Sequence, residues 1–164
     1  MWVLKFLEER KFDGSIMDFG GGDGDFALAA AACGYDTTYF ETSEENIEFV
    51  KWRIKRLASN LKIITELDGK KFDCVTAFDV TEHFQDIAKF IEMLNLLIVP
   101  NNNSYFIETS SFSFRSTGHF DIYNFRNEVI PAKAVNRRFR TEMRLKYEMV
   151  DHGWNSRPVA WKHK

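Results

Sequence analysis

The hydrophobic residues of this 164-residue chain occur in short continuous runs that alternate with stretches in which they recur every three or four positions. The continuous runs predict strands over 15–19, 36–40, 61–65, 72–78 and 103–109. The three-and-four spacing predicts helices over 2–11, 24–33, 43–59 and 86–98. Because strands and helices alternate, the pattern predicts an α/β fold with a mostly parallel sheet and helices on both faces.

The predicted helix over 43–59 has a regular apolar stripe, formed by Ile47, Val50, Ile54, Leu57 and Leu61. Its basic residues fall mostly elsewhere on the helical wheel. The pattern therefore predicts one buried face and one solvated face, and it indicates no function for this helix.

The C-terminal quarter of the chain differs in charge from the rest. Residues 126–164 hold ten Lys or Arg against four Asp or Glu, a net charge of +6, so the rest of the chain carries −8. A predicted C-terminal helix has an apolar stripe of Val135, Phe139, Met143, Tyr147 and Val150, and opposite it a basic stripe of Lys133, Arg137, Arg140 and Arg144. This basic stripe is interpreted either as a solvated face or as a surface for a phosphate-rich partner such as RNA.

The end of the chain leaves little room for further strands. A turn is predicted at 152–154, and 156–164 has the length of one strand. We therefore expect a single domain, with a core over 1–125 and a basic helix plus terminal strand over 126–164. The C-terminal end of the sheet is expected to be truncated or to lack the last strand of a hairpin.

The segment 15–27 is the strongest functional signal in the sequence. It runs from an apolar strand through Asp18 into closely spaced glycines, Gly20, Gly21, Gly22 and Gly24, and then into an Ala-rich helix. Glycines in such a turn let the backbone approach a ligand closely, and the amides of the following helix face that ligand. Residues 22–27 also fit the dinucleotide pattern G-x-G-x-x-A, which keeps a dehydrogenase as an alternative.

The spacing Asp18-x-Gly20-x-Gly22-x-Gly24 resembles the D-x-G-x-G-x-G signature of class I S-adenosylmethionine (SAM) dependent methyltransferases. That resemblance places Asp18 near the methionine end of the cofactor. Glu41 follows the second predicted strand, where an acid bonds a ribose diol in either class of cofactor, and Thr42 is grouped with it.

A second motif separates the two cofactor classes. Residues 72–83 read F-D-x-V-x-x-x-D-V-x-E-H, which is similar to many SAM methyltransferases acting on small molecules, including ubiquinone-type O-methyltransferases and sugar N-methyltransferases. The resemblance covers residues 1–125 and implies a Rossmann-like three-layer sandwich. It also implies SAM as cofactor, S-adenosylhomocysteine as product, and Phe78 and Asp79 beside the cofactor.

Methyl transfer is an in-line attack that positioning accelerates, and a base is needed only for a hydroxyl or a protonated amine. The candidate catalytic residues are Glu82, His83 and His119, which follow the fourth and fifth strands at the ligand-binding edge of the sheet. The two histidines are expected to converge there. For each of them the alternative is a structural hydrogen bond.

A metal site is a further alternative. Asp79, Glu82, His83 and His119 resemble the E-x-x-E-H set with a later His of small-RNA terminal 2′-O-methyltransferases, and such ligands suit Mg²⁺ or Mn²⁺. Here the first acid is Asp instead of Glu, which shortens its reach.

Three hypotheses for function follow: methylation of a small molecule on oxygen or nitrogen, metal-assisted RNA 2′-O-methylation, and a non-catalytic methyltransferase-like module. The chain has no long apolar run and no signal-peptide pattern at its start, so a cytoplasmic location without membrane binding is expected. A homo-oligomer whose second subunit supplies a wall of the acceptor site is also considered.

Overall fold

The computed structural model describes residues 2–114, 116–151 and 157–164, and its centre is one seven-stranded sheet. The strand order is β3-β2-β1-β4-β5-β9-β8. Strands β1 to β5 are parallel, and β9 is antiparallel to both of its neighbours. The strands are β1 (Ile16–Phe19), β2 (Thr37–Phe40), β3 (Lys62–Ile64), β4 (Cys74–Ala77), β5 (Tyr105–Glu108), β8 (Tyr147–Val150) and β9 (Val159–His163).

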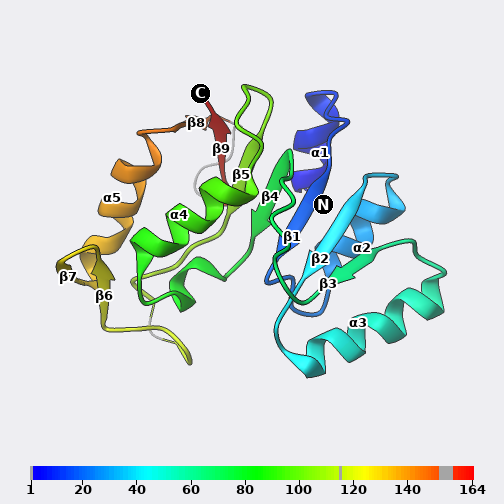
Figure 1. Ribbon diagram of the computed structural model, residues 1–164, viewed down its shortest axis with the longest axis horizontal. Helices are drawn as coiled ribbons and strands as arrows, with labels where there is room; N and C mark the ends of the chain where they lie inside the picture. Colours follow the sequence, from blue (N-terminus) through cyan, green and yellow to red (C-terminus); the bar gives the residue numbers. More distant parts are fainter. Residues whose placement is uncertain (1, 115, 152–156) are drawn as a thin grey trace.

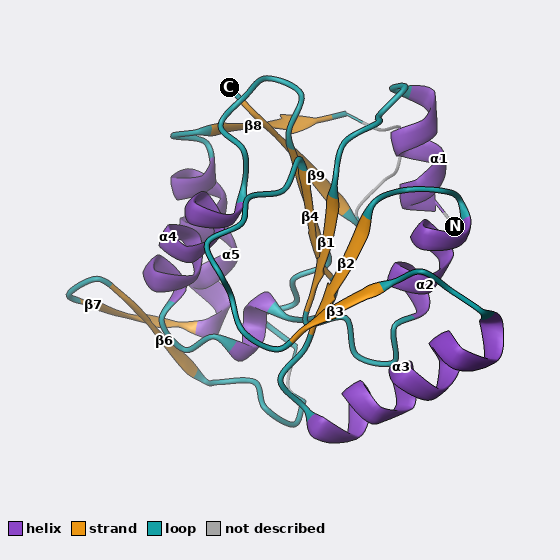
Figure 2. Cartoon of the chain, turned by 45° about the vertical axis from the view of Figure 1, so that its right-hand side comes forward, coloured by secondary structure: helices purple, strands orange, loops and turns teal. Residues whose placement is uncertain are grey.

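Helices cover both faces of this sheet, as the alternating pattern predicts (Figures 1 and 2). One face carries α1 (Trp2–Glu9), α2 (Asp25–Ala32) and α3 (Glu44–Leu57), and the other carries α4 (Ile87–Leu97) and α5 (Ala132–Met143). A short 3-10 helix, η1 (Thr81–His83), follows β4, and a small hairpin of β6 (Ile122–Phe125) and β7 (Glu128–Pro131) precedes α5. Within the described residues, no helix is both long and apolar enough to cross a membrane.

The C-terminal end of the chain differs from its prediction in the length of its helix and in the number of its strands. The helix predicted to continue through Tyr147 and Val150 ends at Met143, and both residues lie in β8. The sheet is not truncated, because β8 and β9 form the antiparallel pair that completes it. Strand β9 also pairs with β5, which lies far from it in the sequence, and such non-local pairing leaves no local signal. The turn predicted at 152–154 lies outside the described residues.

Helix α3 also differs from its prediction. Ile47 and Val50 are buried as expected, but Leu57 is 61% exposed. Two aromatic residues that were not assigned to any face, Phe49 and Trp52, are 47% and 53% exposed. The helix starts at the capping residue Ser43, whose hydroxyl accepts a hydrogen bond from the Asn46 amide.

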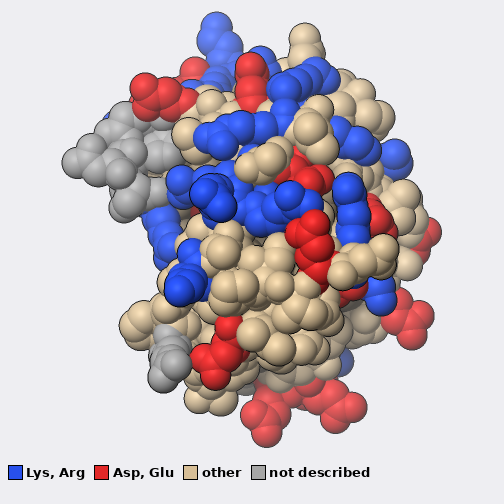
Figure 3. Space-filling model, turned by 90° about the vertical axis from the view of Figure 1, so that its left-hand side faces the viewer, with Lys and Arg blue, Asp and Glu red and all other residues tan. Residues whose placement is uncertain are grey.

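The basic residues of the C-terminal quarter gather on one side of the molecule. Figure 3 shows Lys and Arg side chains concentrated over the face that α5 covers. Lys133, Arg137, Arg140 and Arg144 are all exposed there, while Val135, Phe139 and Met143 on the same helix are buried. The two faces predicted for this helix are therefore confirmed as far as Met143.

Candidate functional site

The glycine turn between β1 and α2 has the backbone conformation that its sequence requires. Gly20, Gly22 and Gly24 have φ angles of 66°, 53° and 77°, in the left-handed region that favours glycine. Gly24 is the N-cap of α2. A Cβ atom at Gly22 would meet no protein atom within 4 Å, so this residue presents open backbone to the space above the turn.

A cavity of about 420 Å³ lies over this turn. Its lining includes five of the residues predicted to bind a cofactor, Asp18, Gly20, Gly21, Gly22 and Phe78. The remaining predicted residues, Gly24, Glu41, Thr42 and Asp79, do not line it. Trp2 and Val3 of α1, together with Asp23, Asp25, Phe26 and Pro158, complete the wall and were missed by sequence reasoning.

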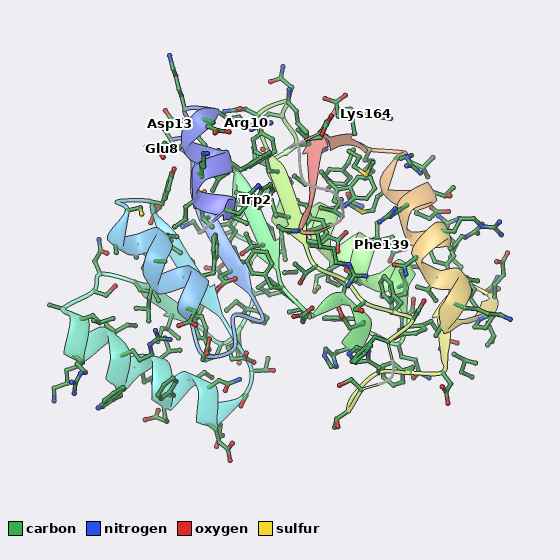
Figure 4. The ribbon with its side chains drawn as sticks, turned by 180° about the vertical axis from the view of Figure 1, so that it is seen from behind. Trp2, Glu8, Arg10, Asp13, Phe139 and Lys164 are labelled. Atoms are coloured by element: carbon green, nitrogen blue, oxygen red, sulfur yellow. The ribbon has the colours of Figure 1, made fainter. Side chains whose placement is uncertain are left out.

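Trp2 and Pro158 come from opposite ends of the chain. Trp2 lies in the first turn of α1, beside the sheet (Figure 4), and Pro158 immediately precedes β9. The spacing of apolar residues over 2–11 predicted a helix but not what it covers. No local signal places either residue at the cavity.

Asp18 is the charged group most deeply set in this cavity. It is 2% exposed, and one of its carboxylate oxygens accepts a hydrogen bond of 2.8 Å from the hydroxyl of Thr76 on β4. Burial raises the pKa of the Asp18 carboxyl to about 7, and the Thr76 bond opposes that rise. A carboxyl in this state ionises readily when a cationic group binds beside it.

Glu41 closes the turn from the end of β2. One of its carboxylate oxygens accepts the Gly22 amide at 3.0 Å, and the other accepts the amides of Thr42 and Ser43 at 2.7 and 3.0 Å. Glu41 therefore connects the glycine turn to the start of α3. Thr42 contributes its backbone amide to this arrangement, and its side chain is exposed.

Tyr39 supports the glycine turn from below. Its hydroxyl donates to the carbonyl oxygen of Gly22 at 2.5 Å, and its ring lies against Gly21, where a Cβ atom would come within 2.6 Å of it. The turn is thus held by two side chains from this region, Tyr39 within β2 and Glu41 just after it.

The two residues predicted after β4 have separate environments. Phe78 lines the cavity and meets Phe26 edge to face, with ring centroids 5.3 Å apart. Asp79 is exposed, has a φ of 53°, and exchanges two hydrogen bonds with Thr109: its amide donates to the Thr109 hydroxyl, which donates to its carboxylate. Asp79 thus joins the loops that follow β4 and β5.

The two predicted histidines converge. The rings of His83 and His119 lie edge to face with centroids 4.9 Å apart. Nδ1 of His83 is 3.1 Å from the Gly118 carbonyl oxygen, and Nδ1 of His119 is 2.6 Å from that of Phe114. A carbonyl can only accept, so Nδ1 carries the proton on both rings and Nε2 is left as the basic atom.

Glu82 does not line the cavity over the glycine turn. It is fully buried, and its Oε1 accepts the Ser111 amide at 2.8 Å, while its Oε2 has no partner among the described residues. Glu108 makes a similar contact, accepting the Ser110 amide at 2.5 Å, and burial raises the pKa of its carboxyl. Both acids therefore anchor the loop that leaves β5.

The residues grouped as an alternative metal site do not assemble into one. In the part of the chain that the structure describes, no three His, Cys, Asp or Glu side chains are placed to hold a metal ion. The bonds of Asp79, Glu82 and the two histidines are instead made to backbone groups and to Thr109.

A second cavity, of about 460 Å³, lies beside the histidine pair. His119, Phe112, Phe114, Phe120 and Lys133 are among its lining residues. It therefore combines aromatic walls with the imidazole of His119, the cation of Lys133 and the carboxylate of Asp121, between the loop after β5 and the start of α5.

The comparisons with known proteins agree with this architecture. A family model described as a methyltransferase domain matches residues 2–156. Among solved structures, the PH0226 protein from Pyrococcus horikoshii OT3 has a TM-score of 0.68, covering 99% of this chain and 87% of its own at 14% identity. A methyltransferase from Pyrococcus furiosus has a TM-score of 0.63, covering 98% and 81% at 15% identity. At these identities the likeness shows the fold alone.

One sequence relative is closer in identity. The ubiquinone biosynthesis O-methyltransferase of Rickettsia akari (strain Hartford) is 34% identical over 93 residues, which are 52% of this chain and 36% of that protein. The match thus spans about a third of the length of that relative.

Proposed function

The chain belongs to the methyltransferase domain family, and from this premise we propose that it transfers the methyl group of SAM to an oxygen or nitrogen atom of a small molecule. The cavity over the glycine turn carries the proposal, because it combines the buried carboxyl of Asp18 with the open backbone of Gly22. In this proposal residues 1–125 form the cofactor-binding core of a single domain, and 126–164 complete the sheet.

The cofactor contacts follow from the chemistry of the lining. Asp18 would hold the ammonium group of the methionine end, since a carboxyl of raised pKa gains a cationic partner on ionising. The amides of the glycine turn would face the middle of the cofactor. Glu41 would accept the ribose hydroxyls in exchange for the Gly22 amide that it now binds. Phe78 and Phe26 would exclude water.

When bound, SAM supplies a methyl group that is electrophilic because it is attached to a positively charged sulfur. The chain has to hold the acceptor in line with that methyl group and to remove a proton where the acceptor carries one. We assign proton removal to Nε2 of His83 or His119, because Nδ1 of each ring is engaged by a carbonyl. Glu82, which precedes His83 in η1, is fully buried and acts as a positioning residue of the loop after β5.

The second cavity is the proposed acceptor site. His119 lies in its wall, and His119 contacts His83 at the end of β4. Three phenylalanines favour an acceptor with an aromatic or apolar body, and Lys133 and Asp121 place one charge of each sign in the same wall.

RNA is the second candidate acceptor, favoured by the exposed basic face of α5 (Figure 3). RNA binding would weaken steeply with salt, whereas binding of an aromatic metabolite would not. The metal-assisted version of this candidate has no assembled ligand set among the described residues. The third hypothesis, a non-catalytic module, was supported by the expected truncation of the sheet. That support is removed because the sheet has seven strands.

The deciding experiment is calorimetric titration with S-adenosylhomocysteine, with NADH as the control ligand. Micromolar binding that Gly22→Val abolishes would support the proposed cofactor site and justify an acceptor screen with and without Mg²⁺. Binding of NADH alone would favour a dinucleotide enzyme. Binding of neither would favour the non-catalytic module.

A further inference from the structure

The outer face of α3 carries a patch that the proposed function does not use. Phe49 and Trp52 are about half exposed, and their rings stack with centroids 5.7 Å apart. Ile47 and Val50 already fill the opposite, buried face of the helix. A single exposed aromatic residue is ordinary, but a stacked pair in the middle of a surface helix indicates a contact surface.

Two oppositely charged residues flank this pair on the same face. Glu45 lies one turn before Phe49, and Arg56 lies one turn after Trp52, so the four residues at i, i+4, i+7 and i+11 form one stripe. All four are exposed. The Arg56 guanidinium lies 5.5 Å from the centre of the Trp52 ring, and within the described residues neither Glu45 nor Arg56 has an ion-pair partner.

The stripe is complementary to itself when it is inverted. A two-fold axis between residues 50 and 51 brings Glu45 opposite Arg56 of a second copy and Phe49 opposite Trp52 of that copy. We propose that this stripe, formed by Glu45, Phe49, Trp52 and Arg56, is the interface of a symmetric homodimer in which two α3 helices pack antiparallel. The opposed helix dipoles favour the same arrangement.

The location of α3 leaves this pairing free of obstruction. The helix runs along the margin of the molecule, on the face of the sheet opposite α4 and α5 (Figures 1 and 2). None of the four stripe residues lines the cavity over the glycine turn or the second cavity. The dimer therefore neither needs nor supplies part of the proposed methyl-transfer site.

The length of the stripe limits how tightly the two copies can bind each other. Glu45 and Arg56 are separated by roughly 16 Å along the helix, at about 1.5 Å per residue. Two helices that pair over about three turns bury less than the roughly 1,200–2,000 Å² of stable interfaces. We therefore expect a concentration-dependent dimer with a dissociation constant on the order of micromolar.

Sedimentation velocity at low salt, over roughly 5 to 500 μM protein, tests the proposal. The wild type should shift from monomer to dimer, and Phe49→Ser and Trp52→Ser should each raise the dissociation constant at least about tenfold. Leu96→Ser is the control, because Leu96 is an apolar residue on α4 that is even more exposed, at 69%. A wild type that is monomeric throughout, or a dimer that Phe49→Ser and Trp52→Ser leave unchanged, would overturn the proposal.

Charge reversal tests the two-fold arrangement itself. Glu45→Lys opposes two cations at each end of the interface and Arg56→Glu opposes two acids, so each variant alone should be monomeric. An equimolar mixture of the two variants pairs opposite charges at both ends and should form a heterodimer. The double variant Glu45→Lys with Arg56→Glu should dimerise by itself. If mixing does not restore association, the antiparallel pairing is wrong.

Discussion

Asp18 and Thr76 are joined across β1 and β4 by a hydrogen bond of 2.8 Å in which the Thr76 hydroxyl donates to the carboxyl group. Thr76 is fully buried and Asp18 is 2% exposed, so this contact sits in the sheet at the floor of the cavity. It holds a carboxyl group whose pKa is about 7 at the position where a cofactor's positive charge is proposed to bind.

The raised pKa of Asp18 predicts how stability changes with pH. Between about pH 4 and pH 7 the folded state keeps a proton that the unfolded state has released, so the free energy of unfolding should fall as pH rises through this window. The loss due to this group is on the order of a few kcal/mol. Urea unfolding of the wild type and of Asp18→Asn, measured across this pH range, isolates the contribution of Asp18. The variant has no carboxyl group at this position, so its free energy of unfolding should not fall for this reason. A variant whose stability falls over this window as much as that of the wild type would contradict the prediction.

Cofactor binding should show the opposite dependence on pH. Because the ionised carboxylate is the form that attracts an ammonium group, affinity for S-adenosylhomocysteine should rise from about pH 5.5 to pH 7 and then level off. Calorimetry in two buffers with different ionisation enthalpies would show a proton released on binding below pH 7. Asp18→Asn should bind weakly and release none. Proton release that persists in this variant would assign the proton to another group.

Replacing Gly22 should weaken ligand binding more than it lowers the stability of the fold. Gly22→Ala places a methyl group at a φ of 53° in open space above the turn, and Gly34→Ala does the same at a φ of 90° away from the cavity. Each should cost about 1–2 kcal/mol of stability through backbone strain. Only Gly22→Ala should weaken S-adenosylhomocysteine binding, by about tenfold or more. Equal affinities in the two variants would remove the glycine turn from the binding site.

The carboxylate of Glu41 should be needed for cofactor binding because both of its oxygens accept hydrogen bonds. Its two oxygens accept amides from Gly22, Thr42 and Ser43, and a glutamine would turn a donor toward one of them. Glu41→Gln should lower the affinity for S-adenosylhomocysteine by about ten- to a hundredfold, the range for charge-assisted hydrogen bonds. Glu44→Gln, a change at an exposed acid in the first turn of α3, is the control. Titration calorimetry on both variants measures the difference.

Gly118 offers a way to move His83 without removing it. A Cβ atom at Gly118 would lie 2.7 Å from Nδ1 of His83, so Gly118→Ala must displace the imidazole. If His83 is the base, the variant should lower kcat for an identified acceptor at least about tenfold and leave the Kd for S-adenosylhomocysteine unchanged. Gly69→Ala is the control, since Gly69 has the same φ of 82° and nothing within 4 Å. An unchanged kcat would leave His83 with a structural role.

The sequence predicted the elements whose signals are local. The alternation of β1 to β5 with their helices and the glycine turn are both confirmed. Each depends on side chains within a few residues of one another. The same local reasoning extended the C-terminal helix into β8, because Tyr147 and Val150 continue its three-and-four spacing. Pairing with β9 overrode that spacing.

The sequence by itself therefore determined where this protein needs glycine, where its helices start and which side chains repeat on a face, since these follow from backbone sterics and periodicity. Only the tertiary structure decided that Trp2 and Pro158 share one cavity, and that His83 and His119 meet although 35 residues lie between them. It also decided the pKa of Asp18, because burial is set by elements that pack from distant parts of the chain.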